Sequence, residues 1–282
     1  MIKTKNPAVF ILLLSVMTVF MYGCDNALSD EQSNEYGNVY EVSEFVPEEQ
    51  FDAYNSDDGT LFRRLLDYRS RLNDSSEFEF YAYANNFIEA IDIDIPEICI
   101  VNYGTEFEAD SKYPVNGDNI TATEAIQVSE NFFDLFPVSI TEGRCFQPTD
   151  FDCQNSETIP VIMGKAYQES FNPGDTFEGY YILERRTFEV IGFTDEESVF
   201  YQRSQNHMES YNHFIIMPFE NIGEDSASAR SILLQQICGF IVPNGDRDSA
   251  LQTIQGYLNE TGLEDWSEMI VVNKMSLRDK MN

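Results

Sequence analysis

The run from Ile126 to Pro218 places short apolar stretches, a cluster of phenylalanines and spaced glycines in one order, and this order constrains the fold. An apolar strand is expected to end at Val128, and Ser129 is the expected cap of a short helix that follows it. The side chains expected to be buried on that helix are Phe132, Phe133, Leu135 and Phe136. Because apolar groups cover nearly its whole circumference, the helix must dock against other elements.

Glycines follow or interrupt the apolar stretches of the same run. They are Gly143, Gly164, Gly174 and Gly192. A residue without a Cβ atom permits a tight turn or a close backbone approach, so each glycine predicts one of these two features at the strands of the run. Taken singly, each is an ordinary turn residue of a β-rich domain, and only their order is specific. Strands are expected at Thr187–Phe193 and His213–Pro218, with a short helix at Lys165–Phe171.

Hydrophobic periodicity predicts further elements on both sides of this run. A helix is expected over Thr60–Leu72, and period-two strands are expected over Phe78–Ala84 and Ile91–Ile95. Residues 231–262 are expected to form a strand, a turn and a helix that ends at Gly262. The capping residue of that helix is expected to be Asp248 or Ser249. The pattern predicts an α+β fold with a β-rich insertion.

The charge balance excludes one large class of partners. The chain carries 49 acidic and 17 basic residues, for a net charge of −32. Binding to nucleic acid requires clustered Lys and Arg, and the sequence has no such cluster. The acids are spread along the chain, and 22 Phe with 15 Tyr supply apolar surface for burial. The sequence therefore predicts a folded, acidic domain that does not bind nucleic acid.

The N-terminus predicts the compartment. Lys3 and Lys5 precede an apolar segment, Ala8–Gly23, and acidic residues follow from Asp25. The segment has 16 residues, which suits either a short membrane-spanning helix or a signal sequence. By the positive-inside rule, the rest of the chain lies outside the cytoplasm. The expected location is the cell membrane, with a single N-terminal anchor and the bulk of the chain extracytoplasmic.

Cys24 supports a second interpretation of the N-terminus. Gly23 followed by Cys24 at the end of an apolar stretch resembles a bacterial lipobox, in which the cysteine is lipidated and becomes the mature N-terminus. Tyr22 and Met21 depart from the residues usual in that motif. Lipidation at Cys24 is therefore the alternative to a spanning helix.

Four further cysteines lie in the extracytoplasmic part, and four thiols allow three pairings. We favour a disulfide between Cys145 and Cys153, because Pro148 and acidic turn residues between them let the chain fold back. Cys99 and Cys238 lie in apolar stretches and are expected to be buried free thiols. The sequence has no CxxC pair and only two histidines, so we expect no metal site and no cofactor.

The order of elements in Ile126–Pro218 resembles the extracytoplasmic core domain of MacB/FtsX-type ABC transporter permeases. The resemblance covers about Val39 to Met281. It implies a mixed α/β lobe formed from both ends of the chain, residues 28–144 with 231–282, and an inserted β-rich lobe, residues 145–222. Residues 1–27 would form the N-terminal membrane helix or signal segment.

The resemblance also implies a function that is not catalytic. In that family a cytoplasmic ATPase moves the membrane helices, and the outer domain binds a substrate or partner and transmits the motion. The ATPase would be reached through membrane helices that are missing from this chain. An extracellular protein or peptide is the expected partner, and the polar stretch Asp195–Asn212 is the expected contact loop. The alternative is a lipid-anchored extracellular binding protein with Cys24 lipidated.

Overall fold

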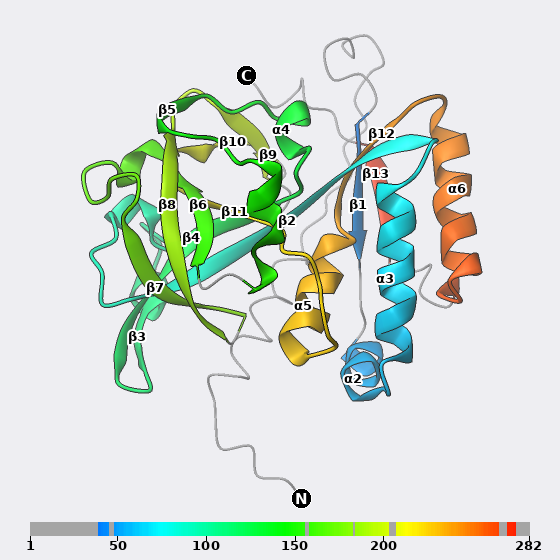
Figure 1. The fold of residues 1–282 in the computed structure, drawn as a ribbon, viewed down its shortest axis with the longest axis horizontal. Helices are drawn as coiled ribbons and strands as arrows, with labels where there is room; N and C mark the ends of the chain where they lie inside the picture. The colour runs from blue at the N-terminus through cyan, green and yellow to red at the C-terminus, as the bar shows by residue number, and fades with distance from the viewer. Residues whose placement is uncertain are drawn as a thin grey trace, which may run out of the picture.

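The computed structural model describes residues 39–44, 48–155, 158–182, 184–202, 207–264 and 270–274 (Figure 1). The predicted membrane segment, residues 1–27, and its Cys24 lie outside the described residues. Among the described helices, none is long and apolar enough to cross a membrane.

Strand β2 (Phe78–Ile91) is the longest strand and takes part in two different pairings. Its first five residues pair with β12 (Gly239–Pro243), and residues 83–91 pair with β4 (Asp118–Val128). Figure 1 shows β2 running between a group of strands on one side and the helices α3, α5 and α6 on the other. The two halves of the molecule are therefore joined by one continuous backbone.

The second half of β2 belongs to a closed barrel. From β2 the pairing passes through four strands to β4, which pairs again with β2. These strands are, in order, β7 (Thr176–Tyr181), β8 (Glu184–Thr194), β6 (Thr158–Met163) and β11 (Ile215–Pro218). The interior is filled by apolar side chains such as Ile88, Val161 and Phe188, so the barrel is a packed core. Strands β3 (Lys112–Val115) and β5 (Ile140–Gly143) extend it by pairing with β4 and β8.

The first half of β2 belongs to an open sheet with helices on one face. The strand order is β2, β12, β1 (Tyr40–Glu44) and β13 (Ile270–Lys274). The helical layer on this sheet consists of α3 (Thr60–Asn73), α5 (Ala227–Gln236) and α6 (Arg247–Glu260), and α2 (Glu48–Ser56) precedes α3. Leu65, Leu233 and Ile254 of these helices share one core with the sheet. Because Tyr40 pairs with Lys274, β1 begins where β13 ends.

An aromatic cluster covers the other face of the sheet. It joins β2 and β12 to the helix α4 (Phe132–Leu135) and to the hairpin of β9 (Val199–Gln202) and β10 (His207–Ser210). The ring of Tyr83 stacks on Phe132 with centroids 5.5 Å apart, and Phe200 stacks on Tyr211 at 4.7 Å. The predicted docking helix is confirmed, since Phe132 and Phe136 are almost fully buried, but Phe133 is only partly buried and the capping position is Asn131 instead of Ser129.

The glycine prediction holds where the backbone is most crowded. A Cβ atom on Gly164 would lie 2.0 Å from the carbonyl oxygen of Asn212, which no side chain could tolerate. Gly143 has a φ of 77°, in the left-handed region that favours glycine. Both residues end strands, as the sequence indicated.

Several predicted elements differ from the structure. Asp195–Asn212 is not an exposed loop, because it contains the hairpin β9–β10, and Phe200 and Tyr211 are fully buried there. The first residues of 231–262 are helical, since α5 extends to Gln236. The period-two pattern at Ile91–Ile95 is not a strand beyond Ile91, because Asp92 has a φ of 51° and turns the chain.

Two smaller differences concern helix ends. The cap of α6 is Asp246, whose side chain accepts a hydrogen bond from the backbone of Ser249, so the expected capping residues lie inside the helix. The expected helix at Lys165–Phe171 is a short 3-10 turn, η4 (Lys165–Tyr167). The stop at Gly262 is confirmed by its φ of 68°.

The division into lobes 28–144 with 231–282 and 145–222 stays a prediction about which parts of the chain move together. Strand pairing crosses the boundary near residue 144, because β4 precedes it and β11 follows it. These two strands are parallel neighbours in the barrel.

The barrel core should respond strongly to truncation of one ring. Phe188 is fully buried and stacks on Phe177 with centroids 5.0 Å apart. We expect Phe188→Ala to lower the free energy of unfolding by about 3 to 5 kcal/mol, because it leaves a cavity. The matched control is Phe107→Ala, since Phe107 is 56% exposed and should cost less than about 0.5 kcal/mol. Urea titration of both variants measures the difference, and equal losses would contradict the assigned core.

Candidate functional site

A polar hollow of about 490 Å³ opens beside β2, where the helical layer meets the barrel. Its apolar floor includes Phe80 and Phe219. Arg69 of α3 and Gln236 of α5 line it from the helical layer, and the segment 129–134 that follows β4 lines it from the other side. The hollow therefore has walls from both halves of the molecule.

Arg69 is the cation of this hollow, and it is not among the arginines that form ion pairs in the described part of the chain. Within the described part of the chain, no group forms an ion pair or hydrogen bond with its guanidinium. Five other arginines form ion pairs: Arg71, Arg144, Arg185, Arg186 and Arg230. Burial lowers the pKa of the half-buried Arg69 side chain, which nevertheless stays charged at neutral pH. In a chain with 49 acids, an unpaired arginine is available to an external anion.

The side chain of Gln236 contains a second polar group that has no hydrogen-bond partner among the described residues. Its side-chain amide donates a hydrogen bond of 2.7 Å to the carbonyl oxygen of Glu220, which fixes the orientation of the amide. The other end of the amide, Oε1, has no partner among the described residues, although the side chain is only 2% exposed. An unsatisfied buried acceptor costs about 1 to 3 kcal/mol, so this oxygen would be stabilised by a donor that reached it.

The opposite wall is held rigidly. Asn131 donates a hydrogen bond of 3.0 Å to the carbonyl oxygen of Phe80, and the hydroxyl of Ser129 donates to Asn131 at 2.7 Å. These bonds tie the segment after β4 to the first half of β2. They also place two exposed carboxylates, Glu130 and Asp134, on this wall.

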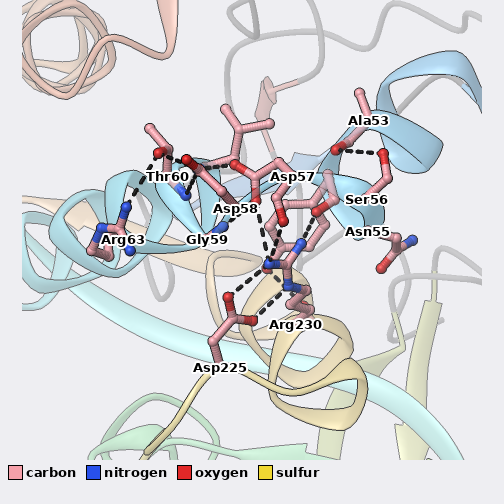
Figure 2. Close-up of polar contacts among 12 residues, drawn as sticks. Ala53, Asn55, Ser56, Asp57, Asp58, Gly59, Thr60, Arg63, Asp225 and Arg230 are labelled. Atoms are coloured by element: carbon pink, nitrogen blue, oxygen red, sulfur yellow. Dashed lines mark hydrogen bonds and ion pairs between the residues drawn. The ribbon is translucent and has the colours of Figure 1, made fainter.

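A second charged cluster fastens α5 to the connection between α2 and α3 (Figure 2). Arg230 forms a two-pronged contact with Asp225, at 2.6 and 2.7 Å, and reaches Asp57 at 3.2 Å. It also donates to the backbone carbonyl of Tyr54 and lies over the ring of that residue at 5.4 Å. Figure 2 shows the guanidinium enclosed between these carboxylates. The side chain is 9% exposed, so the cluster acts as a buried latch.

Asp57 and Asp225 have separate structural roles in this latch. Asp57 accepts hydrogen bonds from the backbone of Gly59 and Leu61, at 2.8 and 2.7 Å, and so stabilises the start of α3. The hydrogen bond from Arg230 lowers the pKa of Asp225 below its ordinary value. The contribution of Asp225 to stability is therefore present above that ordinary value and is lost as the pH falls through the lowered pKa.

A line of polar contacts connects the helical layer to the barrel. Asn86 of β2 donates to Gln235 of α5 at 2.9 Å and to the hydroxyl of Tyr181 in β7 at 3.2 Å. That hydroxyl donates to Gln127 of β4 at 2.5 Å. Movement of α5 would therefore strain contacts with two barrel strands.

Two titratable side chains have shifted pKa values: Glu124 of β4, and His213, which follows the hairpin. Burial, with a smaller contribution from Glu209, raises the pKa of Glu124 to about 7. Burial lowers the pKa of His213, and Glu209 partly opposes this. Glu209 itself contacts the Nε2 atom of His207 at 2.6 Å. The charge of Glu209 on the hairpin therefore acts both on Glu124 of β4 and on His213, which follows the hairpin.

One exposed loop was not predicted from the sequence to be a contact surface. Residues 96–111 carry the large apolar side chains Ile98, Tyr103 and Phe107, which are 47%, 46% and 56% exposed. The loop is tied to β4 by a 3.0 Å hydrogen bond from the backbone of Val101 to the carbonyl of Ala122. Ser111 closes it by donating to the carbonyl of Val101 at 2.6 Å. It is therefore a firmly held loop with an apolar tip.

The described residues do not test the predicted disulfide between Cys145 and Cys153. Cys145 is half-buried after β5, and the side chain of Cys153 lies outside the described part of the chain. The disulfide between them stays a prediction. Cys99 is a buried free thiol as expected, and burial raises its pKa to about 12; Cys238 is buried, as expected.

The groups of the hollow were not predicted from the sequence. Arg69 lies in a helix that also contains Arg63, Arg64 and Arg71, and no local pattern separates it from these three arginines. Gln236 was placed in a strand, so its side chain was not expected to face α3. Only the packing of α5 against β2 brings these two residues to one surface.

The latch should require arginine and not only a positive charge. We expect Arg230→Lys to lower the free energy of unfolding by about 2 kcal/mol, because lysine cannot contact two carboxylates and the Tyr54 carbonyl together. The matched control is Arg71→Lys, whose ion pairs with Asp67 and Glu260 are exposed to solvent and should contribute little to stability. Thermal and urea unfolding measure both changes. A loss no larger for Arg230→Lys than for the control would refute the latch.

The raised pKa of Glu124 predicts a pH dependence. Because the folded protein holds this proton more tightly than the unfolded chain, stability should decline as the pH rises from about 4.5 to 7. At pH 8, Glu124→Gln should be more stable than the parent, by up to about 3 kcal/mol. The exposed Glu142→Gln serves as the control. Urea unfolding across this pH range measures the effect, and a parallel pH profile for the parent and Glu124→Gln would count against it.

Comparison with known proteins gives a clear family match. Residues 9–255 match the MacB-like periplasmic core domain. No curated protein sequence matches the chain. The periplasmic region of MacB from Actinobacillus actinomycetemcomitans is similar at 11% identity and a TM-score of 0.46, covering 84% of this chain and 89% of that one. The extracellular domain of the ABC-type transporter YknZ from Gram-positive bacteria is similar at 12% identity and a TM-score of 0.42, covering 85% and 100%. Since the family match spans most of the 282 residues, the chain belongs to the MacB-like periplasmic core domain family, the extracytoplasmic domains of ABC transporter permeases.

Proposed function

We propose that this chain is a non-catalytic coupling domain, which binds a substrate or partner outside the cytoplasm and transmits motion driven by a cytoplasmic ATPase. The family match carries this proposal. The pairing of Tyr40 with Lys274 supports it, because a domain whose first and last strands meet at one sheet edge can be inserted between two membrane helices. Membrane segments on both sides would then act on the same edge.

The path of the motion follows from the strand order. Strands β1 and β13 belong to the open sheet, which is joined to the barrel through β12 and β2. At about 3.3 Å per residue, the 14 residues of β2 extend over about 45 Å. A continuous strand of this length connects the two halves directly, so motion of the open sheet would pass along it to the barrel. The contacts of Asn86 and Arg230 hold α5 to the same frame, so the open sheet and its helices would move together.

The lobes proposed from the sequence need one adjustment to fit this path. We propose that the second half of β2, with β3 and β4, moves with the barrel strands of 145–222. The closed pairing of β4 with both β2 and β11 supports this division. The remaining parts of 28–144 and 231–282 would move as the α/β lobe.

The loop 96–111 is the proposed partner surface in place of Asp195–Asn212. Its apolar tip is surrounded by exposed acids, including Glu97, Glu106 and Asp110, and the segment contains no Lys or Arg. A protein segment with apolar and basic side chains would complement it. The hydrogen bonds that hold the loop mean that little conformational entropy would be lost on binding.

The coupling role is tested by identifying the proteins that co-purify with this protein from its native membrane. The product of the complete gene, tagged at its C-terminus and extracted in mild detergent, should co-purify with an ATP-binding subunit and show ATP hydrolysis. A version lacking residues 1–27 should lose the ATPase, because the proposed contact runs through the membrane. If the intact product is recovered from the membrane fraction with no ATP-binding subunit, the proposal is wrong.

A further inference from the structure

The hollow contains two groups that would bind chemically different parts of a ligand. Arg69 is a half-buried cation without a partner among the described residues, and a guanidinium in this state favours a carboxylate or phosphate. The Oε1 atom of Gln236 is a buried acceptor without a partner in the same part of the chain, and it favours an N–H or O–H donor. A ligand that meets both must carry an anionic group and a hydrogen-bond donor.

The charged residues of the other wall determine which charge the second end of the ligand should carry. Glu130 and Asp134 give the lining two negative charges against the single positive charge of Arg69. A simple anion would be repelled by these carboxylates, whereas a ligand with a separate ammonium group would gain from them. The observations favour a zwitterion.

The volume of the hollow and the residues that line it indicate the size and the kind of zwitterion. A hollow of about 490 Å³ is within the range of small-molecule sites, about 300 to 1,000 Å³. Phe80 and Phe219 offer apolar contact, while the amide of Gln236 is suited to a peptide N–H. We propose that the hollow binds a short peptide with free ends, its carboxylate at Arg69 and its amino group toward Glu130 and Asp134.

The position of the hollow links this site to the coupling role. Arg69 and Gln236 belong to the helical layer, and the acidic wall follows barrel strand β4. A bound peptide would bridge the two halves that we propose move against each other. This deepens the proposed function, on which it rests for its purpose, although binding itself requires no ATPase.

The test is direct calorimetric titration of the purified 282-residue chain in detergent with trialanine. We expect saturable binding, and we expect Arg69→Gln to weaken it by about tenfold or more. Arg64→Gln is the matched control, because Arg64 is an exposed arginine of the same helix that contacts the carbonyl of Gly262. It should bind as the parent does. Arg69 has no ion pair within the described residues, so Arg69→Gln should keep the parent melting temperature.

Two ligand controls separate the proposed chemistry from simpler binding. Trialanine with an acetylated amino end and an amidated carboxyl end should bind at least about tenfold more weakly, since it lacks both charges. Inorganic phosphate should also bind weakly, because it has no ammonium group for the acidic wall. Equal binding of parent and Arg69→Gln, equal binding of the blocked peptide, phosphate binding as tight as trialanine, or no trialanine binding up to about 10 mM would each overturn the proposal. None of these outcomes bears on whether an ATP-binding subunit co-purifies.

Discussion

The side chains of β2 alternate across the strand, and the same face of this one strand enters two separate cores. Phe78, Phe80, Ala82 and Ala84 point into the core beneath the helices, and Ile88 and Ala90 point into the barrel. Because side chains of a strand alternate with a period of two, a slip of one residue would remove both sets from their cores at once. The register of β2 therefore fixes the helical layer and the barrel together. Small residues at 82 and 84 leave space for the close packing of α5, which contacts β2 directly.

Asn86 marks the change from one core to the other. It lies on the same face as the apolar residues of β2, where an unpaired amide would be costly. Gln235 and Tyr181 supply its partners from α5 and from β7. A polar network with its partners in place is specific in a way that an apolar contact is not, because each bond needs its own geometry. This network and the latch of Arg230 fix how α5 sits, and α5 in turn presents Gln236 to the hollow.

The sequence predicted those elements whose cause is local. The run Phe132–Phe136 is apolar except for Asp134, and the helix of Thr60–Leu72 has a clear period, so both were recognised. The hairpin of Asp195–Asn212 was missed, because its many polar residues outweighed the short apolar stretch at Val199–Tyr201. The helix α5 was taken for a strand, since only Gln235 and Gln236 separate its apolar residues from the apolar stretch that leads into β12. The barrel could not be foreseen, because its closure depends on the return of β4 to β2.

The hollow depends on this long-range closure more than on any motif. Its walls come from α3 and α5 on one side, and from the segments that follow β4 and β11 on the other. If the two halves shift against each other, the distance between the Arg69 wall and the Glu130 wall must change. A ligand that spans both walls then has a different affinity in each arrangement, and by linkage it must bias the arrangement by the same free energy. Unmet polar groups at such a junction are costly in a rigid protein, but in a moving one they make the state of the junction sensitive to what is bound there.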